Sequence, residues 1–168
     1  ESVLGKEPVL AICYGAQLIA KSLNGNVENS NSREYGRAKL SFIDSNCKLF
    51  KNINIDNQVW MSHGDTITSL PNDSKLIAST GSVVNAAYSI ESLNLYALQF
   101  HPEVFHTENG FKIFENFFIN ELKFIKEWNP ESFIDRTVDD LKKKLMDDKV
   151  ILGLSGGVDS SVAAVLLD

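Results

Sequence analysis

The sequence has little cysteine and no long apolar or basic runs, and each shortage excludes a class of protein. Only Cys13 and Cys47 occur in 168 residues, which argues against a secreted disulfide scaffold and favours a reducing, cytoplasmic setting. No apolar run reaches the roughly 18 residues of a membrane span. The 16 Lys and Arg residues are outnumbered by 22 Asp and Glu residues, without a sustained basic run. We therefore expect neither a nucleic-acid nor a membrane partner.

What is present suits an ordered domain. Apolar residues make up 43% of the sequence and charged residues 23%, close to the average of globular proteins. The chain starts without Met and ends inside an apolar, helix-forming run. We therefore expect it to be an internal segment of a longer protein, inactive in synthesis when isolated.

The apolar pattern predicts an α/β protein. A short buried strand over 8–13 precedes a helix over 16–23, with Asn24 and Gly25 as its C-cap. Residues 27–100 are β-rich, and a helix with an aromatic stripe follows over about 110–126. The candidate strands of the β-rich part are Ala38–Ile43, Val59–Ser62, Leu76–Thr80, Ala86–Ile90 and Leu95–Phe100.

A domain boundary is expected near Trp128. Asn129 is a good N-cap and Pro130 a good first residue for a helix that ends near Leu145. An apolar strand is predicted over Val150–Leu154. We expect residues 1–127 to form one domain and residues 128–168 to begin another.

Cys13 lies at a predicted strand-to-helix turn. Such a turn needs small neighbours and points a nucleophile out of the carboxyl edge of the sheet. The start of a helix also favours a thiolate. A buried structural cysteine is the competing interpretation, and from the turn alone the two are about equally weighted.

His101 strengthens the catalytic interpretation. The predicted strand ends at this residue, Pro102 stops the strand, and Glu103 is close enough to orient the imidazole. A cysteine, a histidine and a carboxylate together can supply a nucleophile, a base and a group that orients the base.

These motifs, Cys-Tyr-Gly-Ala-Gln and Phe-His-Pro-Glu, resemble those of the class I glutamine amidotransferases, which have a flavodoxin-like sheet. The resemblance implies that Cys13 attacks the amide of glutamine, that His101 is the acid and base, and that Glu103 orients it. It also implies contacts with glutamine from Tyr14, Gln17, Ser62, His63 and Gly64. One departure is Ala11, where the family usually has Gly. The glycine-rich oxyanion loop of the family has no counterpart in this sequence.

A second motif follows the predicted strand at 150–154. Glycines allow a close approach to phosphate, and backbone N–H groups at a helix start bind it. The absence of Gly-Lys-Ser/Thr excludes a Walker loop. The string resembles the ATP-binding loop of the N-type ATP pyrophosphatases, whose domain is Rossmann-like. That resemblance implies ATP contacts from Ser155, Gly156, Gly157, Val158, Asp159, Ser160 and Ser161, with Asp159 a candidate magnesium ligand.

The two motifs in this order resemble the GMP synthase family. That resemblance implies amination of XMP to GMP, with glutamine, XMP, ATP and Mg²⁺ as reactants, no prosthetic group, and a homodimer formed through a later domain. Two alternatives stay open: a non-catalytic fragment, and an amidotransferase joined to a different ATP pyrophosphatase, such as one for NAD synthesis.

Overall fold

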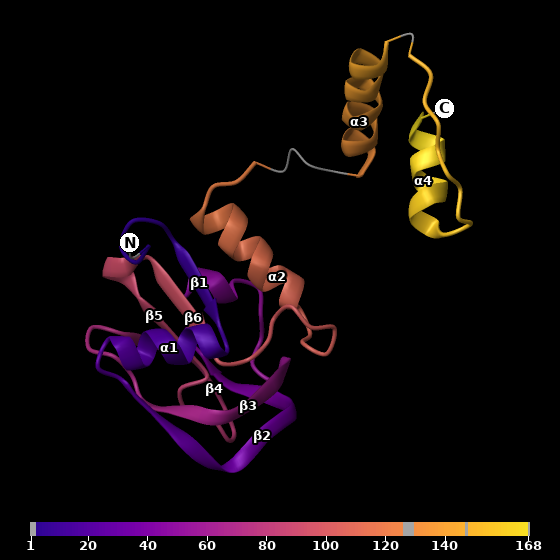
Figure 1. Ribbon diagram of the computed structural model, residues 1–168. Coiled ribbons are helices and arrows are strands. Elements are labelled where there is room, and N and C mark those ends of the chain that lie inside the picture. Colours follow the sequence, from indigo (N-terminus) through magenta and orange to yellow (C-terminus); the bar gives the residue numbers. More distant parts are fainter. Residues whose placement is uncertain (1–2, 126–129, 147, 168) are drawn as a thin grey trace. The chain divides into compact units, whose positions relative to one another are not determined.

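The computed structural model describes residues 3–125, 130–146 and 148–167, which belong to two compact units (Figure 1). The first unit spans Glu1–Phe124 and the second Ile125–Asp168. No described helix is long and apolar enough to cross a membrane.

The first unit is built on a six-stranded mixed sheet with the order β1-β6-β5-β4-β2-β3. Only β1 and β6 pair in parallel among the described strands; the remaining pairs are antiparallel. The strands are β1 Val9–Ile12, β2 Asn26–Ile43, β3 Gln58–Ser69, β4 Lys75–Thr80, β5 Ala87–Ile90 and β6 Leu95–Leu98. The mixed sheet with its parallel β1–β6 pair confirms the expected α/β class.

Strands β2 and β3 are longer than the sequence pattern predicts. They form a long antiparallel pair that runs from Asn26 opposite Ser69 to Lys39 opposite Gln58. The register shifts between Asn29 and Glu34, so this part of β2 does not follow a regular two-residue alternation. The missing alternation explains why residues 26–37 were not predicted as a strand.

Helix α1 spans Tyr14–Ser22 and ends as predicted. Asn24 adopts a left-handed conformation with φ of 65°, and the Gly25 N–H donates to the Ala20 carbonyl at 2.8 Å. This bond closes a Schellman turn, which confirms the predicted C-cap. A Cβ atom on Gly25 would lie only 2.8 Å from the Ala20 and Ser69 carbonyl oxygens, so the close contact with β3 requires glycine.

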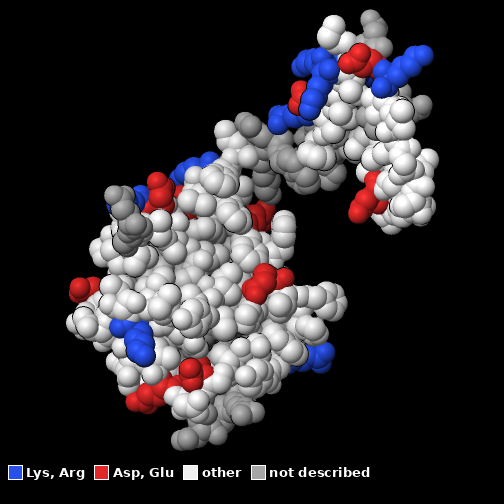
Figure 2. Space-filling model, viewed as in Figure 1, with Lys and Arg blue, Asp and Glu red and all other residues white. Residues whose placement is uncertain are grey.

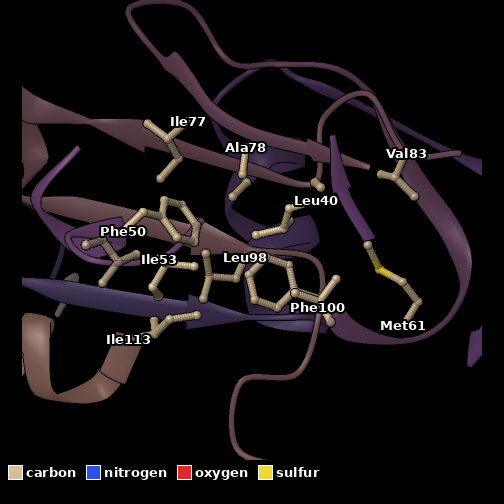
Figure 3. Close-up of a cluster of buried hydrophobic side chains, with 14 of the residues drawn as sticks. Leu40, Phe50, Ile53, Met61, Ile77, Ala78, Val83, Leu98, Phe100 and Ile113 are labelled. Atoms are coloured by element: carbon tan, nitrogen blue, oxygen red, sulfur yellow. The ribbon is translucent and has the colours of Figure 1, made fainter. Parts of the chain in front are cut away.

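Two groups of buried side chains form the core of the first unit. One lies between the sheet and the 3₁₀ helix Lys48–Phe50, with Leu40, Phe50, Leu98 and Phe100 at its centre (Figure 3). The other packs Ala16 and Ala20 of α1 against β1, β6 and the ring of Tyr88. Burial of such side chains supplies about 1.5–3 kcal/mol each. The core therefore fixes α1 against the parallel strand pair.

The helix predicted over 110–126 is shorter and changes its type. Helix α2 spans Gly110–Glu115 and continues as the π-helix η3 over Asn116–Glu121. The wider turn changes the spacing of the apolar stripe, so Phe117 is buried whereas Phe118 and Ile125 are exposed. Residue 126 lies outside the described residues.

The second unit contains helices α3, Pro130–Leu145, and α4, Val158–Leu167. The expected boundary residues Trp128 and Asn129 lie outside the described residues. The strand predicted over Val150–Leu154 is not formed: these residues are irregular and exposed. A strand needs a neighbour for its backbone groups, and the described residues of this unit offer no other strand.

Charged side chains are unevenly distributed on the face drawn in Figure 2. In the first unit, single basic groups lie among acidic ones, whereas basic side chains gather at one end of the second unit. There, Lys142, Lys143 and Lys144 occupy the last turn of α3. Cations at a helix C-terminus interact favourably with the helix dipole, so this cluster has a structural explanation.

Candidate active site

The parallel pair of β1 and β6 brings the two main candidate residues to one edge of the sheet. Ile12 pairs with Leu98 at the carboxyl ends of the strands. Cys13 follows β1 directly, and its backbone N–H donates to the Leu98 carbonyl at 2.8 Å. His101 lies three residues beyond Leu98 in the chain.

Cys13 lies in a strained turn between β1 and α1. Its φ of 49° and ψ of −106° are unusual for a residue with a side chain, and it occupies the N-cap position of α1. Such strain is often found at functional positions. The predicted strand–cysteine–helix turn is therefore confirmed as a structural feature.

The Cys13 thiol is half-buried beside β3. Its Sγ lies 3.8 Å from the Ser62 carbonyl oxygen. Burial raises the pKa of the thiol, the backbone N–H of Tyr14 lowers it, and the negative charge of Glu103 raises it. The net effect is a raised pKa, so the free thiol is mostly protonated at neutral pH and needs a base to act as a nucleophile.

His101 is held by both its backbone and its ring. Its N–H donates to the Trp60 carbonyl at 2.9 Å, and its carbonyl accepts a hydrogen bond from the Thr107 hydroxyl at 2.5 Å. The ring Nδ1 lies 2.5 Å from a Glu103 carboxylate oxygen. The other ring nitrogen, Nε2, is buried and has no partner among the described residues. The imidazole is oriented, and one nitrogen is left free to exchange a proton.

Gln17 faces the protein as well as the expected pocket. The Gln17 backbone N–H donates to the Cys13 carbonyl at 3.1 Å. Its side-chain Nε2 donates to the Asp65 carbonyl at 2.7 Å and to Gln99 Oε1 at 3.4 Å. The amide of this expected glutamine-contacting residue is thus already oriented by β3 and by Gln99.

Residues 62–64 lie in β3, next to the thiol. Ser62 is exposed and offers its carbonyl, whereas His63 is only 5% exposed and neither of its ring nitrogens has a partner among the described residues. Burial lowers the pKa of His63, and the nearby positive charge of protonated His101 also lowers it. His63 therefore favours the neutral form. Tyr14, the remaining residue expected to contact glutamine, is 71% exposed at the start of α1.

Gln99 is a residue of the site that the sequence did not single out. It is 1% exposed and lies two positions before His101. The available signal was its polar side chain, placed between the buried Leu98 and Phe100 at the end of a strand.

The second motif forms an exposed turn before α4. Gly156 has a φ of 81°, and the Gly157 N–H donates to Ser155 Oγ at 3.4 Å. The hydroxyls of Ser160 and Ser161 donate to the Gly157 carbonyl at 3.1 and 2.9 Å. Val158 and Asp159 occupy the first turn of α4. The turn leads into a helix N-terminus, as the sequence predicts.

Asp159 is the only carboxylate in this turn. The described part of the chain contains no group of three His, Cys, Asp or Glu side chains that could hold a metal by themselves. Mg²⁺ commonly uses one or two carboxylates together with substrate phosphates, so a single aspartate suits a magnesium ion that arrives with a nucleotide.

The fold and site define an α/β protein with a cysteine, a histidine and a glutamate at the carboxyl edge of a parallel strand pair. The chain belongs to the class-I glutamine amidotransferase family, whose model matches residues 1–121. A second family model, NAD synthase, matches residues 131–168.

Curated relatives resemble nearly the whole chain. "GMP synthase [glutamine-hydrolyzing] 1" of Bacteroides thetaiotaomicron is 54% identical over 166 residues, which cover 99% of this chain and 33% of that protein. "GMP synthase [glutamine-hydrolyzing]" of Flavobacterium psychrophilum is 52% identical over 165 residues, covering 98% of this chain and 32% of the relative. The chain thus spans about a third of the length of these relatives.

Solved structures share the fold. A candidate GMP synthase protein of Thermoplasma acidophilum is 37% identical with a TM-score of 0.63, covering 67% of this chain and 59% of that one. A glutamine amidotransferase of Thermotoga maritima has a TM-score of 0.52 at 23% identity, covering 96% of this chain and 63% of that one. The second likeness shows the fold alone.

Proposed function

We propose that the first unit hydrolyses the side-chain amide of glutamine at Cys13. The observation that carries this proposal is the state of His101, whose Nδ1 is held by Glu103 while its buried Nε2 has no partner among the described residues. A base poised in this way beside a cysteine at a strand-to-helix turn suits nucleophilic catalysis.

In the proposed reaction, the Cys13 sulfur attacks the amide carbon and His101 Nε2 takes the thiol proton. The same imidazole then gives the proton to the nitrogen as ammonia leaves and a glutamyl thioester forms. Water, deprotonated by His101, hydrolyses the thioester, which releases glutamate and restores the thiol. Glu103 holds the ring and stabilises its protonated form, and the backbone N–H of Tyr14 is a donor for the oxyanion.

Gln17 and residues 62–64 would hold the amino-acid end of glutamine. This assignment is supported by their place around the thiol: Ser62 contacts Cys13, and Gln17 lies one turn into the helix that Cys13 begins. Tyr14, His63 and Gly64 complete the proposed set.

We further propose that the protein of which these residues form a part converts XMP to GMP. The support is the name shared by the curated relatives and the match of residues 131–168 to an ATP-using family. The turn at 155–161 would bind the phosphates of ATP, and Asp159 a magnesium ion. Ammonia from the first unit would then displace AMP from adenylyl-XMP. A cytoplasmic homodimer is the expected setting.

Replacement of the thiol in the full-length protein tests the proposal. Cys13→Ala should abolish glutamine-dependent GMP formation and leave ammonia-dependent formation largely intact, because added ammonia bypasses the thiol. Asp159→Ala should impair synthesis from either nitrogen source and leave the reaction of Cys13 with a glutamine-like chloroketone unchanged. Equal loss of both activities in Cys13→Ala would contradict the division into two sites.

A second candidate is glutamine-dependent NAD synthesis, which the NAD synthase match to residues 131–168 favours. The substrate decides between them. Full-length protein supplied with ATP and ammonia should consume XMP; consumption of a nicotinate dinucleotide in its place would support the second candidate.

A further inference from the structure

The Gln99 side chain connects three segments that surround Cys13. Its Oε1 accepts hydrogen bonds from the Ile67 N–H at 3.2 Å and from Gln17 Nε2 at 3.4 Å. Its Nε2 donates to the Asn85 carbonyl at 3.0 Å and to the Thr66 hydroxyl at 3.4 Å. Helix α1, strand β3 and the β4–β5 connection therefore all contact one buried amide.

These contacts fix which way each amide points. If the Gln99 amide were reversed, its NH₂ would face the Ile67 N–H and its oxygen would face the Asn85 carbonyl. If the Gln17 amide were reversed, its oxygen would face two acceptors, the Asp65 carbonyl and Gln99 Oε1. Both reversed arrangements replace hydrogen bonds with repulsive contacts between like groups.

The fixed orientation leaves one hydrogen-bonding group of Gln17 unused. With Nε2 turned toward Asp65 and Gln99, the Oε1 atom accepts no hydrogen bond from the described residues. Unlike the ring nitrogens of His63, this oxygen is not sealed inside the core. Gln17 thus carries a fixed acceptor in the first turns of the helix that begins at Cys13.

We propose that Gln99 is a positioning residue that orients Gln17, so that Gln17 Oε1 accepts a hydrogen bond from a donor group of the bound glutamine. The inference rests on the proposed hydrolysis of glutamine at Cys13. Gln99 touches no reacting atom and acts through Gln17, so its loss impairs recognition of the amino acid and leaves the intrinsic reactivity of the thiol intact.

Two alkylating reagents separate recognition from reactivity in the full-length protein. A glutamine-like chloroketone needs the amino-acid pocket to reach Cys13, whereas iodoacetamide does not. The measured quantity is the ratio of the two alkylation rates at Cys13. Gln99→Leu and Gln17→Leu should each lower this ratio about tenfold, as expected for the loss of one oriented hydrogen bond. The double variant should fall no further, because both changes remove the same interaction.

Asn116→Leu is the matched control. Asn116 is another buried amide, whose Nδ2 donates to the Leu49 and Lys51 carbonyls at 2.9 Å each, away from the site. This variant should lose stability as Gln99→Leu does and keep the wild-type ratio. Gln99→Glu keeps an acceptor for Gln17 and Ile67 and should retain most of the ratio. If Gln99→Leu does not fold, Gln99→Glu and Gln17→Leu decide the question.

An unchanged ratio in Gln99→Leu, or losses that add in the double variant, would overturn the role of Gln99 and leave the proposed hydrolysis standing. If Gln17→Leu keeps the wild-type ratio, the role of both side chains is overturned. If the wild-type protein itself does not react with the chloroketone at Cys13, the proposed hydrolysis and the inference fall together.

Discussion

Gly110 lies so close to Pro102 that a Cβ atom on the glycine would overlap the Pro102 carbonyl oxygen. Pro102 stands between His101 and Glu103, so the first residue of α2 supports the segment that holds the imidazole. Because the contact is made with backbone on both sides, a side chain could be accommodated only if that segment moved.

Gly110→Ala should therefore reduce the glutaminase rate strongly. Relief of the overlap requires the two backbone segments to separate, and a displacement of about 1 Å around a reacting group costs about 100-fold in rate. Gly81→Ala is the control, because a Cβ there meets no atom within 4 Å. A Gly110→Ala protein with full activity would show that the segment tolerates the shift.

Glu103→Gln should change two measurements in opposite senses. The charge of Glu103 raises the pKa of Cys13, so its removal should let the thiolate form at a lower pH. The pH midpoint for alkylation of Cys13 by iodoacetamide should move down. Glutamine hydrolysis should nevertheless slow by about 10²-fold, because the base is held less firmly. A midpoint that stays in place would show that the carboxylate does not act on the thiol.

His63 should make the protein less stable in acid. Burial keeps its pKa below the usual value, so the unfolded chain binds this proton more readily than the folded one. The free energy of unfolding should therefore fall as the pH is lowered through the usual pKa of histidine, about 6.5. Denaturant titrations between pH 7 and 5 should show a smaller decline for His63→Gln. His106→Gln, at an exposed histidine, should keep the wild-type decline.

Tyr88→Phe should destabilise the first unit without a change in the thiol. The buried Tyr88 hydroxyl donates to the Ala16 carbonyl at 2.9 Å and links β5 to α1. The loss of this bond should lower the free energy of unfolding by about 1 kcal/mol. Tyr35→Phe, at a residue that is 64% exposed, should have almost no effect in the same denaturation experiment.

Local features of the sequence were enough to locate the turn at Cys13, the C-cap at Asn24 and the end of the strand before His101. Each depends on neighbouring residues in the chain: small residues at a turn, a residue that tolerates positive φ, and a proline that stops a strand. The family followed from the same motifs, and the model match over residues 1–121 agrees with it.

Features that depend on contacts between distant segments were not predictable in the same way. The π-turn at Asn116 accompanies hydrogen bonds to the carbonyls of Leu49 and Lys51. The strand expected over Val150–Leu154 has an apolar sequence but no described neighbour to pair with. Gln99 looks like an ordinary strand residue until the segments around it are in place. In each case the deciding contact lies far away in the sequence.

The parallel pairing of β1 with β6 also sets when the site can exist. Val9 pairs with Leu95, although most of the first unit separates them in the chain. Pairing between such distant segments is slow, whereas helices and hairpins such as β2–β3 form from nearby residues. A refolding chain should thus gain most of its secondary structure before Cys13 and His101 meet. Capture of the chloroketone should appear only in the slowest folding phase, which makes the thiol a clock for closure of the sheet.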